Sequence, residues 1–209
     1  MPPHGPGLYG ATHSHDPQYP DDNWNLYSML DPGTTALNIT KPEHAIGIFK
    51  PHVLKLSDEP LIISDADEEI IVIAKFTSPV HIRKLMFIGG GDESQHPSSV
   101  KIYPNKDDID FTNVSSYNPA QEFNLPLNST GTIEHTIAHI QPFSNIMCCT
   151  FYFPTNNGSD STIIKYIGMQ GEHTHYRREA VNAKYEVLCT GQDIVQPEGQ
   201  LGAHSSHMH

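Results

Sequence analysis

Two histidines and a glutamate near the C-terminal end of the chain have a spacing that could hold a metal ion. His173 and His175 stand two residues apart, and Glu179 follows four residues later. In an extended strand, residues two apart point to the same face, so the two imidazoles would lie side by side. Imidazole and carboxylate groups are ordinary ligands of zinc, iron and copper. The sequence therefore contains a candidate metal site at these three residues. The alternative is that the histidines are exposed on the surface and bind no metal.

The same stretch partly resembles cupins, which are small β-barrels with metal-dependent chemistry. In cupins a glycine, two histidines and a glutamate recur at fixed spacing, and a second motif supplies a further histidine. Here the glycine is one residue out of place, and the second motif is imitated only by Pro197 and Gly199, with His204 displaced. Because a ligand is missing, the pattern favours exposed histidines over a cupin-like metalloenzyme, and we expect no cofactor.

A run of carboxylates forms the second chemical feature, in which Asp65, Asp67, Glu68 and Glu69 follow Ser64. Asp65, Asp67 and Glu69 alternate, so an extended chain would place them on one face, where oxygen atoms can hold Ca²⁺. The EF-hand pattern is absent. The alternatives are a solvated acidic edge, a docking patch for lysine and arginine, and a turn in which Asp65 or Asp67 accepts backbone N–H groups.

Composition excludes some partners. The formal net charge is −12, with only 12 lysines and arginines, and these are scattered along the chain. Binding to nucleic acid or to an anionic membrane needs clustered cations, so we expect neither partner. No apolar run approaches the length of a membrane span, and no secretory leader is visible. The three cysteines, Cys148, Cys149 and Cys189, are interpreted as free thiols, because neighbouring residues of a strand point to opposite faces.

The acidic run leads directly into the longest apolar run of the chain, Ile70 to Ile73, which does not alternate with polar residues. Such a pattern predicts a strand buried on both faces. Further strands follow at regular intervals, separated by turns rich in proline, glycine and asparagine, with one turn at Thr77 to Pro79. In residues 80–88, Val80, Ile82 and Lys84 share one face and Leu85 and Phe87 share the other, which predicts a bulge or a switch of sides. The nine predicted strands cover 45–49, 70–76, 80–88, 99–103, 121–125, 132–138, 145–153, 161–170 and 184–188. No long amphipathic helix separates them, which favours an all-β sandwich or jelly roll.

The ends of the chain differ from its middle. Residues 23–30 are predicted to form a short helix that places Trp24, Tyr27 and Leu30 on one face. Residues 1–22 are rich in histidine, proline and glycine and are expected to be disordered, because they cannot bury enough apolar surface to offset the entropy of ordering. Residues 191–209 form a second flexible, histidine-rich tail. The folded domain is expected over residues 23–190.

An ordered set of segments resembles the PITH domain family of proteasome-interacting domains, closest to its stand-alone members without a thioredoxin half. The matching segments are 37–38, 48–51, 64–71, 76–77, 97, 100–103, 110–111, 143–146, 162–168 and 171–172. The resemblance implies a jelly-roll β-sandwich similar to galactose-binding modules, without a catalytic centre. It also implies association with the 26S proteasome and a location in cytoplasm and nucleus. The chain departs from the family pattern at Ala36, His52 and His173, where a cysteine and two aromatic residues are usual.

Three functions follow from these patterns. The first is a non-enzymatic interaction module that docks on the regulatory particle of the proteasome, with Asp65, Asp67, Glu68 and Glu69 as charge complements to a basic partner. The second is a jelly roll that binds a small molecule or carbohydrate through the loops 89–95 and 156–160. The third is the metalloenzyme that uses His173, His175 and Glu179.

Overall fold

The computed structural model describes residues 22–173, and within them it contains eight β-strands and short 3-10 helices. The strands are β1 (Thr35–Leu37), β2 (Ile62–Ile63), β3 (Ile70–Gly89), β4 (Ser99–Pro104), β5 (Gln121–Asn124), β6 (His135–Thr136), β7 (Ile146–Phe153) and β8 (Ile163–His173). The 3-10 helices are η1 (Asn25–Met29), η2 (Pro42–His44), η3 (His52–Leu54), η4 (Glu93–Gln95), η5 (Val114–Ser116) and η6 (Gln141–Phe143). Among these residues no helix is long and apolar enough to cross a membrane. Residues 1–21 of the predicted tail 1–22, the predicted tail 191–209, the strand at 184–188 and the C-terminal end of the predicted domain lie outside the described residues. Asp22, the last residue of the predicted N-terminal tail, is placed and accepts hydrogen bonds from the backbone N–H groups of Trp24 and His52.

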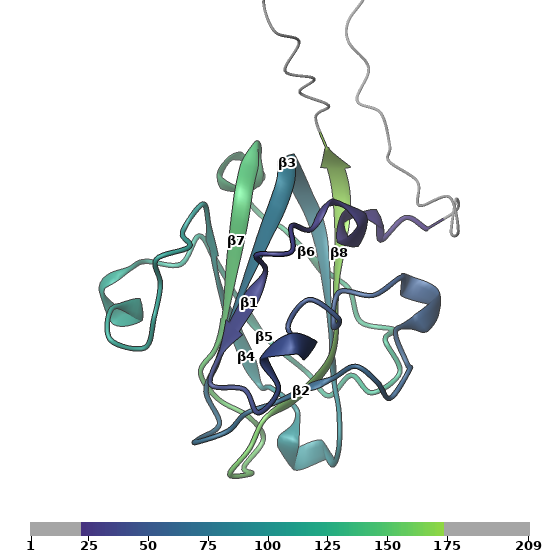
Figure 1. Ribbon diagram of the computed structural model, residues 1–209, viewed down its shortest axis with the longest axis vertical. Coiled ribbons are helices and arrows are strands. Elements are labelled where there is room, and N and C mark those ends of the chain that lie inside the picture. Colours follow the sequence, from purple (N-terminus) through teal and green to yellow (C-terminus); the bar gives the residue numbers. More distant parts are fainter. Residues whose placement is uncertain (1–21, 174–209) are drawn as a thin grey trace, which may run out of the picture. The chain divides into compact units, whose positions relative to one another are not determined.

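Strand β3 organises the fold (Figure 1). Its first half pairs with β1 and β7, its second half pairs with β8 and β6, and every pairing is antiparallel. The ladder with β7 skips from Lys75 to Val80, and in this interval the strand passes from one set of partners to the other. The predicted chain reversal at Thr77 to Pro79 is therefore wrong. Pro79 has no backbone N–H to donate, and it stands where the ladder with β7 is interrupted.

The two halves of β3 lie in two packed layers that share one core. Phe87 in the second half packs edge-on against Phe151 and Phe153 of β7, with ring centroids 6.0 and 5.7 Å apart. Val72 of the first half and Ile167 of β8 belong to the same buried cluster. Edge-to-face aromatic pairs add specific geometry to the burial of apolar surface. This antiparallel arrangement confirms the predicted all-β sandwich of the jelly-roll type.

The prediction of a strand buried on both faces is confirmed for Ile70 to Ile73, whose side chains are at most 5% exposed. One face of this stretch contacts the shared core, and the other packs against Ile109 and Val114 from the long connection between β4 and β5. A predicted bulge in the second half of β3 is also confirmed. Ile82 pairs with Gly171 and Lys84 with Gln170, which leaves Arg83 as the extra residue.

The predicted N-terminal helix is present as the 3-10 helix η1 and lies against β8. Its entry is held by Asp22, whose Oδ1 atom accepts a hydrogen bond from the backbone N–H of Trp24 at 2.8 Å. Trp24 and Leu26 are buried, and Leu30 already bridges to Phe76 of β3. The segment is thus too short for a regular α-helix before the chain joins the sheet.

The strand predicted at Ala45 to Phe49 is wrong, because these residues form turns. The backbone N–H of Gly47 donates to the carbonyl of His44 at 3.0 Å, and that of Phe49 donates to Ile46 at 3.2 Å. Backbone groups bonded to carbonyls three residues earlier are not available for a β ladder. The thiols of Cys148 and Cys149 are free and buried, as predicted, and burial raises the pKa of both. Cys189 lies outside the described residues.

Candidate interaction surface

The acidic run forms a surface turn between β2 and β3. Ser64 is buried at its start, Asp65 and Asp67 are exposed, and Glu68 and Glu69 are half-buried where the chain enters β3. The Ser64 hydroxyl accepts a hydrogen bond from the backbone N–H of Thr162 at 2.9 Å. The Thr162 hydroxyl in turn donates to the carbonyl of Glu68 at 2.6 Å. The turn is therefore fixed to the start of β8 at both of its ends.

Asn38 holds the middle of this acidic turn from the residue after β1. Its Nδ2 atom lies 2.7 Å from Asp67 Oδ1, 3.3 Å from the Asp67 carbonyl and 2.6 Å from the Glu69 carbonyl. Its Oδ1 atom accepts from the backbone N–H of Ala66 at 2.9 Å. Asn38 has φ of +59°, in the left-handed region that asparagine tolerates better than most residues. One amide thus satisfies the oxygen atoms of the turn that a cation would otherwise coordinate.

The four predicted docking carboxylates divide into two pairs. Asp67 also accepts from the backbone N–H of Glu69 at 3.1 Å, and Glu69 accepts a hydrogen bond from the Tyr152 hydroxyl. Burial, followed by the charge of Glu69, raises the pKa of Tyr152 to about 12. Asp65 and Glu68, in contrast, form no side-chain hydrogen bond or ion pair with residues 22–173. Asp67 therefore supports the structural interpretation, whereas Asp65 and Glu68 remain available to a partner.

The structure describes only one of the three predicted metal ligands. His173 is buried at the end of β8, opposite Val80 of β3, while His175 and Glu179 lie outside the described residues. In the part of the chain that the structure describes, no three histidine, cysteine, aspartate or glutamate side chains are grouped to hold a metal ion. His173 therefore differs from the exposed histidine that the sequence favoured.

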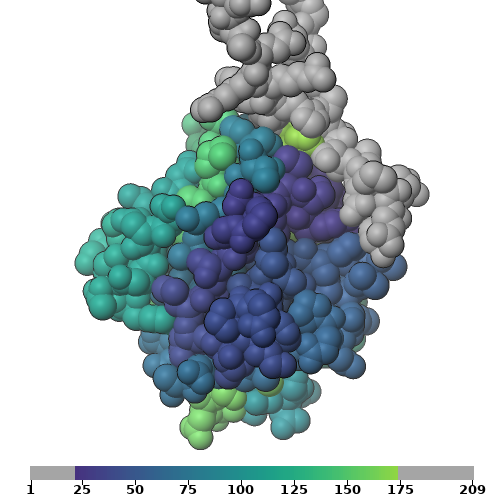
Figure 2. All heavy atoms as spheres, in the orientation of Figure 1, coloured from purple at the N-terminus to yellow at the C-terminus, as the bar shows by residue number. Residues whose placement is uncertain are grey.

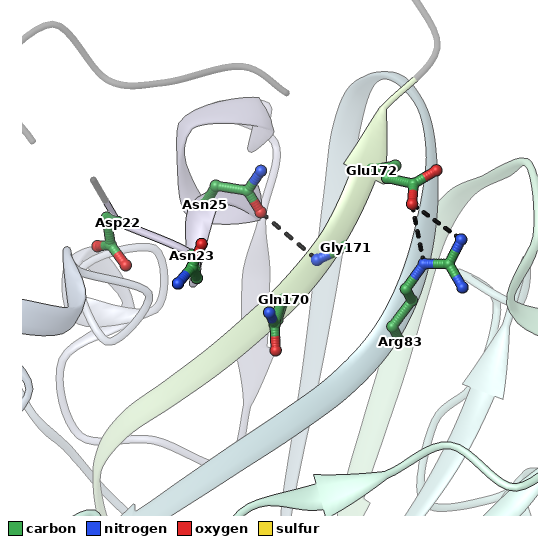
Figure 3. A pocket seen from close by; sticks show the side chains of 7 residues that line it. All are labelled: Asp22, Asn23, Asn25, Arg83, Gln170, Gly171 and Glu172. Atoms are coloured by element: carbon green, nitrogen blue, oxygen red, sulfur yellow. Dashed lines mark hydrogen bonds and ion pairs between the residues drawn. The ribbon is translucent and has the colours of Figure 1, made fainter. Parts of the chain in front are cut away.

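A small polar cavity of about 70 Å³ lies near the end of β8, between η1 and β3 (Figure 3). At its edge, Arg83 forms an ion pair with Glu172 at 2.8 Å, and the Asn25 side chain accepts from the backbone N–H of Gly171. A Cβ atom on Gly171 would stand 1.9 Å from the carbonyl oxygen of His81. The cavity lining is thus occupied with joining β8 to its neighbours, and only a glycine permits this approach.

The two loops predicted to bind a small molecule lie together at one end of the sandwich (Figure 1). The Asn157 amide donates to the carbonyls of Glu93 and His96, and Gln95 donates to the hydroxyl of Ser161. The Asn156 amide is used within its own loop. These amide groups tie the loops to each other, so no observation here favours a carbohydrate function over docking.

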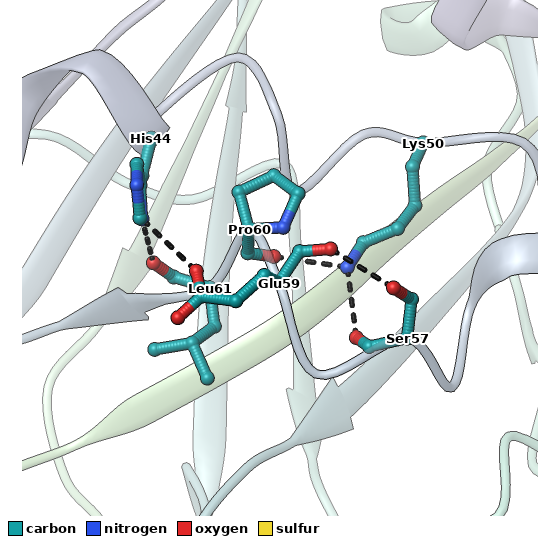
Figure 4. Close-up of polar contacts among 6 residues, drawn as sticks. All are labelled: His44, Lys50, Ser57, Glu59, Pro60 and Leu61. Atoms are coloured by element: carbon teal, nitrogen blue, oxygen red, sulfur yellow. Dashed lines mark hydrogen bonds and ion pairs between the residues drawn. The ribbon is translucent and has the colours of Figure 1, made fainter.

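The segment 45–60, named the Lys50 loop, was not recognised as a surface feature from the sequence. Lys50 is buried, and its Nζ atom donates to the carbonyls of Ser57 at 3.1 Å and Pro60 at 2.9 Å (Figure 4). Burial, followed by the charge of Lys165, lowers the pKa of Lys50. The loop carries exposed leucine, valine and isoleucine side chains. The available signal was the apolar cluster directly after Lys50 and Pro51 in a segment too turn-rich for a strand.

His52 fixes the Lys50 loop to η1 and β8. Its ring stacks on Trp24 with centroids 5.5 Å apart, and its Nε2 atom lies 3.0 Å from Lys55 Nζ. Because the ammonium can only donate, Nε2 accepts and the ring proton is on Nδ1, 3.4 Å from the Tyr166 hydroxyl. The stack on Trp24 shows that the His52 ring packs here as an aromatic side chain would.

We expect the folded chain to lose stability as the pH falls below about 6.5. The pKa values of His52, His96 and His135 are all lowered, mainly by burial, and for His52 also by Lys55, against the opposing charges of Asp22 and Glu134. At pH values between the pKa of each histidine in the unfolded chain and its lowered pKa in the folded chain, the unfolded chain therefore binds more protons than the folded chain. Stability is fully present above this window and falls within it, by at most about 1.4 kcal/mol per pH unit for each histidine.

Urea unfolding at pH 7.5 and at pH 5.5 measures this loss. His96→Gln should reduce the difference between the two values, whereas His139→Gln, at an exposed position, should leave it unchanged. Equal stability of the original chain at both pH values would contradict the expectation.

The chain is similar in sequence to a known family of proteins. A family profile described as the PITH domain matches residues 16–188. The chain is 35% identical over 179 residues to PITH domain-containing protein 1 of Dictyostelium discoideum, covering 84% of this chain and 86% of the relative. It is 31% identical over 172 residues to PITH domain-containing protein 1 of Homo sapiens, covering 81% and 80%.

Solved structures with a similar fold include carbohydrate-binding modules. The structure of the CBM32-1 and CBM32-2 domains of Clostridium perfringens ZmpB in complex with GalNAc is 10% identical, with a TM-score of 0.48, and covers 71% of this chain and 35% of that one. The family 32 module of Streptococcus pneumoniae EndoD is 17% identical, with a TM-score of 0.45, and covers 68% and 97%. The sugar ligand is a property of the ZmpB domains.

Proposed function

Because this chain belongs to the PITH domain family, we propose that it is a non-enzymatic interaction module that associates with the regulatory particle of the 26S proteasome. Proteasome association is what the family resemblance implies, and the corresponding locations are cytoplasm and nucleus. The family match extends over most of the chain, from residue 16 to residue 188.

The observation that supports docking most directly is that the acidic turn contains two kinds of residue, some that fix its backbone and some whose carboxylates have no internal partner. Asn38, Asp67 and Thr162 hold the backbone in place, while the carboxylates of Asp65 and Glu68 have no internal partner among residues 22–173. A fixed turn loses little conformational entropy when a partner binds, which favours association. Exposed charges mainly raise the association rate with an oppositely charged surface, and salt screens this effect. The proposed docking role thus narrows to Asp65 and Glu68, with Asp67 and Glu69 as positioning residues.

The test is a direct binding measurement between the full chain and purified 26S proteasome at low and at physiological salt. We expect binding whose association rate falls with salt. The double variant Asp65→Asn, Glu68→Gln should lower that rate about three- to tenfold at low salt, with little change in the dissociation rate.

The control is Asp107→Asn, Glu122→Gln, which also removes two negative charges, from exposed positions elsewhere, one of them in an ion pair with Lys75 at 3.2 Å. It should leave the association rate near that of the original chain. Absence of any binding to the proteasome at low salt would refute the proposed function, and an equal effect of both double variants would refute the role of the turn.

A further inference from the structure

Exposed apolar side chains are concentrated on the Lys50 loop. Four of the eight large apolar residues that are exposed within residues 22–173 lie in one stretch of eleven positions, and Figure 2 shows this blue segment on the surface of the face in view. These four, named the apolar patch, are Ile46 (38% exposed), Val53 (68%), Leu54 (44%) and Leu56 (50%). Single exposed apolar residues are ordinary, but a local cluster marks an interaction site.

The backbone that carries the apolar patch is fixed from several directions. The His52 backbone N–H donates to the Asp22 carboxylate at 2.8 Å, and Lys55 Nζ donates to the Gly131 carbonyl at 2.9 Å. The Ser57 N–H donates to the Leu54 carbonyl at 2.9 Å, and Lys50 holds the far end of the loop. The apolar side chains therefore project from an ordered surface and not from a loose loop. A preorganised surface binds with a smaller entropic cost.

Exposed carboxylates outnumber exposed lysine side chains in residues 41–60. Glu43 is exposed, and the side chains of Asp58 and Glu59 are 93% and 69% exposed. Asp58 forms an ion pair with Lys165 at 3.0 Å, and the Glu59 carboxylate lies 3.8 Å from His44 Nδ1. The ammonium groups of Lys50 and Lys55 point into hydrogen bonds with carbonyl oxygens, which leaves Lys41 as the exposed cation of residues 41–60. A partner segment that fits this surface has apolar side chains for the centre and lysine or arginine at the edges.

We infer that the apolar patch is the main binding surface for a protein segment of this kind, apolar in its centre and basic at its ends. The inference rests on the proposed function, since it names the surface and the partner chemistry of the same docking event. Buried apolar contacts determine the dissociation rate, whereas the acidic turn acts on the association rate. The two surfaces therefore make separable contributions.

The first experiment does not require the proteasome. The full chain, labelled with ¹⁵N, is titrated with a synthetic peptide of leucine and lysine whose leucines fall on one helix face, and with the same peptide carrying glutamate in place of lysine. We expect amide shifts confined to residues 41–60 with the lysine peptide and at least tenfold weaker binding of the glutamate peptide. The triple variant Val53→Ser, Leu54→Ser, Leu56→Ser should also bind at least tenfold more weakly.

The matched control is Ile140→Ser, Met147→Ser, which removes exposed apolar side chains of 45% and 47% exposure elsewhere. It should bind the lysine peptide like the original chain. Shifts located outside the Lys50 loop, or equal affinity of the triple variant, overturn the inference. Self-association of the original chain that the triple variant abolishes, without peptide binding, identifies a second copy as the occupant and overturns it as well.

The same variants are then measured against purified 26S proteasome. The triple variant should dissociate at least tenfold faster than the original chain. If the original chain binds and the triple variant binds equally well, the apolar patch is refuted while the proposed function stands. If the original chain does not bind the proteasome but binds the lysine peptide through the patch, the proposed function is refuted while the surface assignment stands.

Discussion

Replacement of Gly171 by alanine is expected to destabilise the folded chain by about 4 kcal/mol or more. The added Cβ atom would stand 1.9 Å from the carbonyl oxygen of His81 and 3.0 Å from the Leu26 side chain. The first contact is with the backbone of β3, which is held in its ladder and cannot move aside without breaking pairs with β8. Overpacking against a rigid backbone is among the most costly single changes in a protein interior.

Thermal unfolding measures this effect, and the melting temperature should fall by roughly 10 °C or more. Gly33→Ala is the matched control, because its nearest contact is the flexible Asp31 carboxylate at 3.0 Å. We expect a change below about 1 kcal/mol for this control. Similar stability of both variants would show that β8 does not approach β3 as closely as described.

The second large effect is expected for Lys50→Met, which should destabilise the chain by about 2–3 kcal/mol. The substitution keeps the apolar part of the side chain but removes the charged donor. The carbonyls of Ser57 and Pro60 then each lose the hydrogen bond that Lys50 Nζ donates. Relief from the cost of burying an ammonium offsets part of this loss. Because these bonds close the Lys50 loop, the variant should also loosen the surface that carries the apolar patch.

Two measurements separate the loss of global stability from the local loosening of the Lys50 loop. Urea unfolding reports the change in free energy, and hydrogen exchange should show faster exchange of amides in residues 45–60 while the amides of β3 change only with global stability. Lys41→Met is the control, since Lys41 is exposed and should change stability by less than about 0.5 kcal/mol. Unchanged exchange in the loop of the Lys50→Met variant would show that Lys50 does not organise it.

Several residues in the segments that resemble the PITH family make contacts that stabilise this fold. Asn38 and Ser64 fix the acidic turn, Lys50 closes its loop, and Gly171 permits the contact between β8 and β3. These four residues therefore stabilise the fold itself. The exposed groups next to them, in the acidic turn and the apolar patch, are the ones available to a partner.

Local sequence determined the parts of this protein that depend on residue period and turn chemistry. The unbroken apolar run from Ile70 to Ile73 predicted a doubly buried strand, and the change of period near Arg83 predicted a bulge. A surface turn held by Asp65 or Asp67 was one of the alternatives that the acidic run allowed. Each of these features follows from which side chains tolerate water, a property of neighbouring residues alone.

Tertiary structure decided what depends on residues far apart in the chain. The stretch at Ala45 to Phe49 has the apolar content of a strand, but it forms turns and docks on β8, where the backbone N–H of Ile167 donates to the Ile48 carbonyl at 3.1 Å. Likewise, four similar carboxylates divide into two that are held and two without an internal partner among residues 22–173, because Asn38 contacts Asp67 and Tyr152 contacts Glu69 from distant parts of the chain. Hydrogen-bond partners supplied over long sequence separations leave no periodic signal. The division within the acidic turn, and with it the candidate docking surface, therefore emerged only from the folded chain.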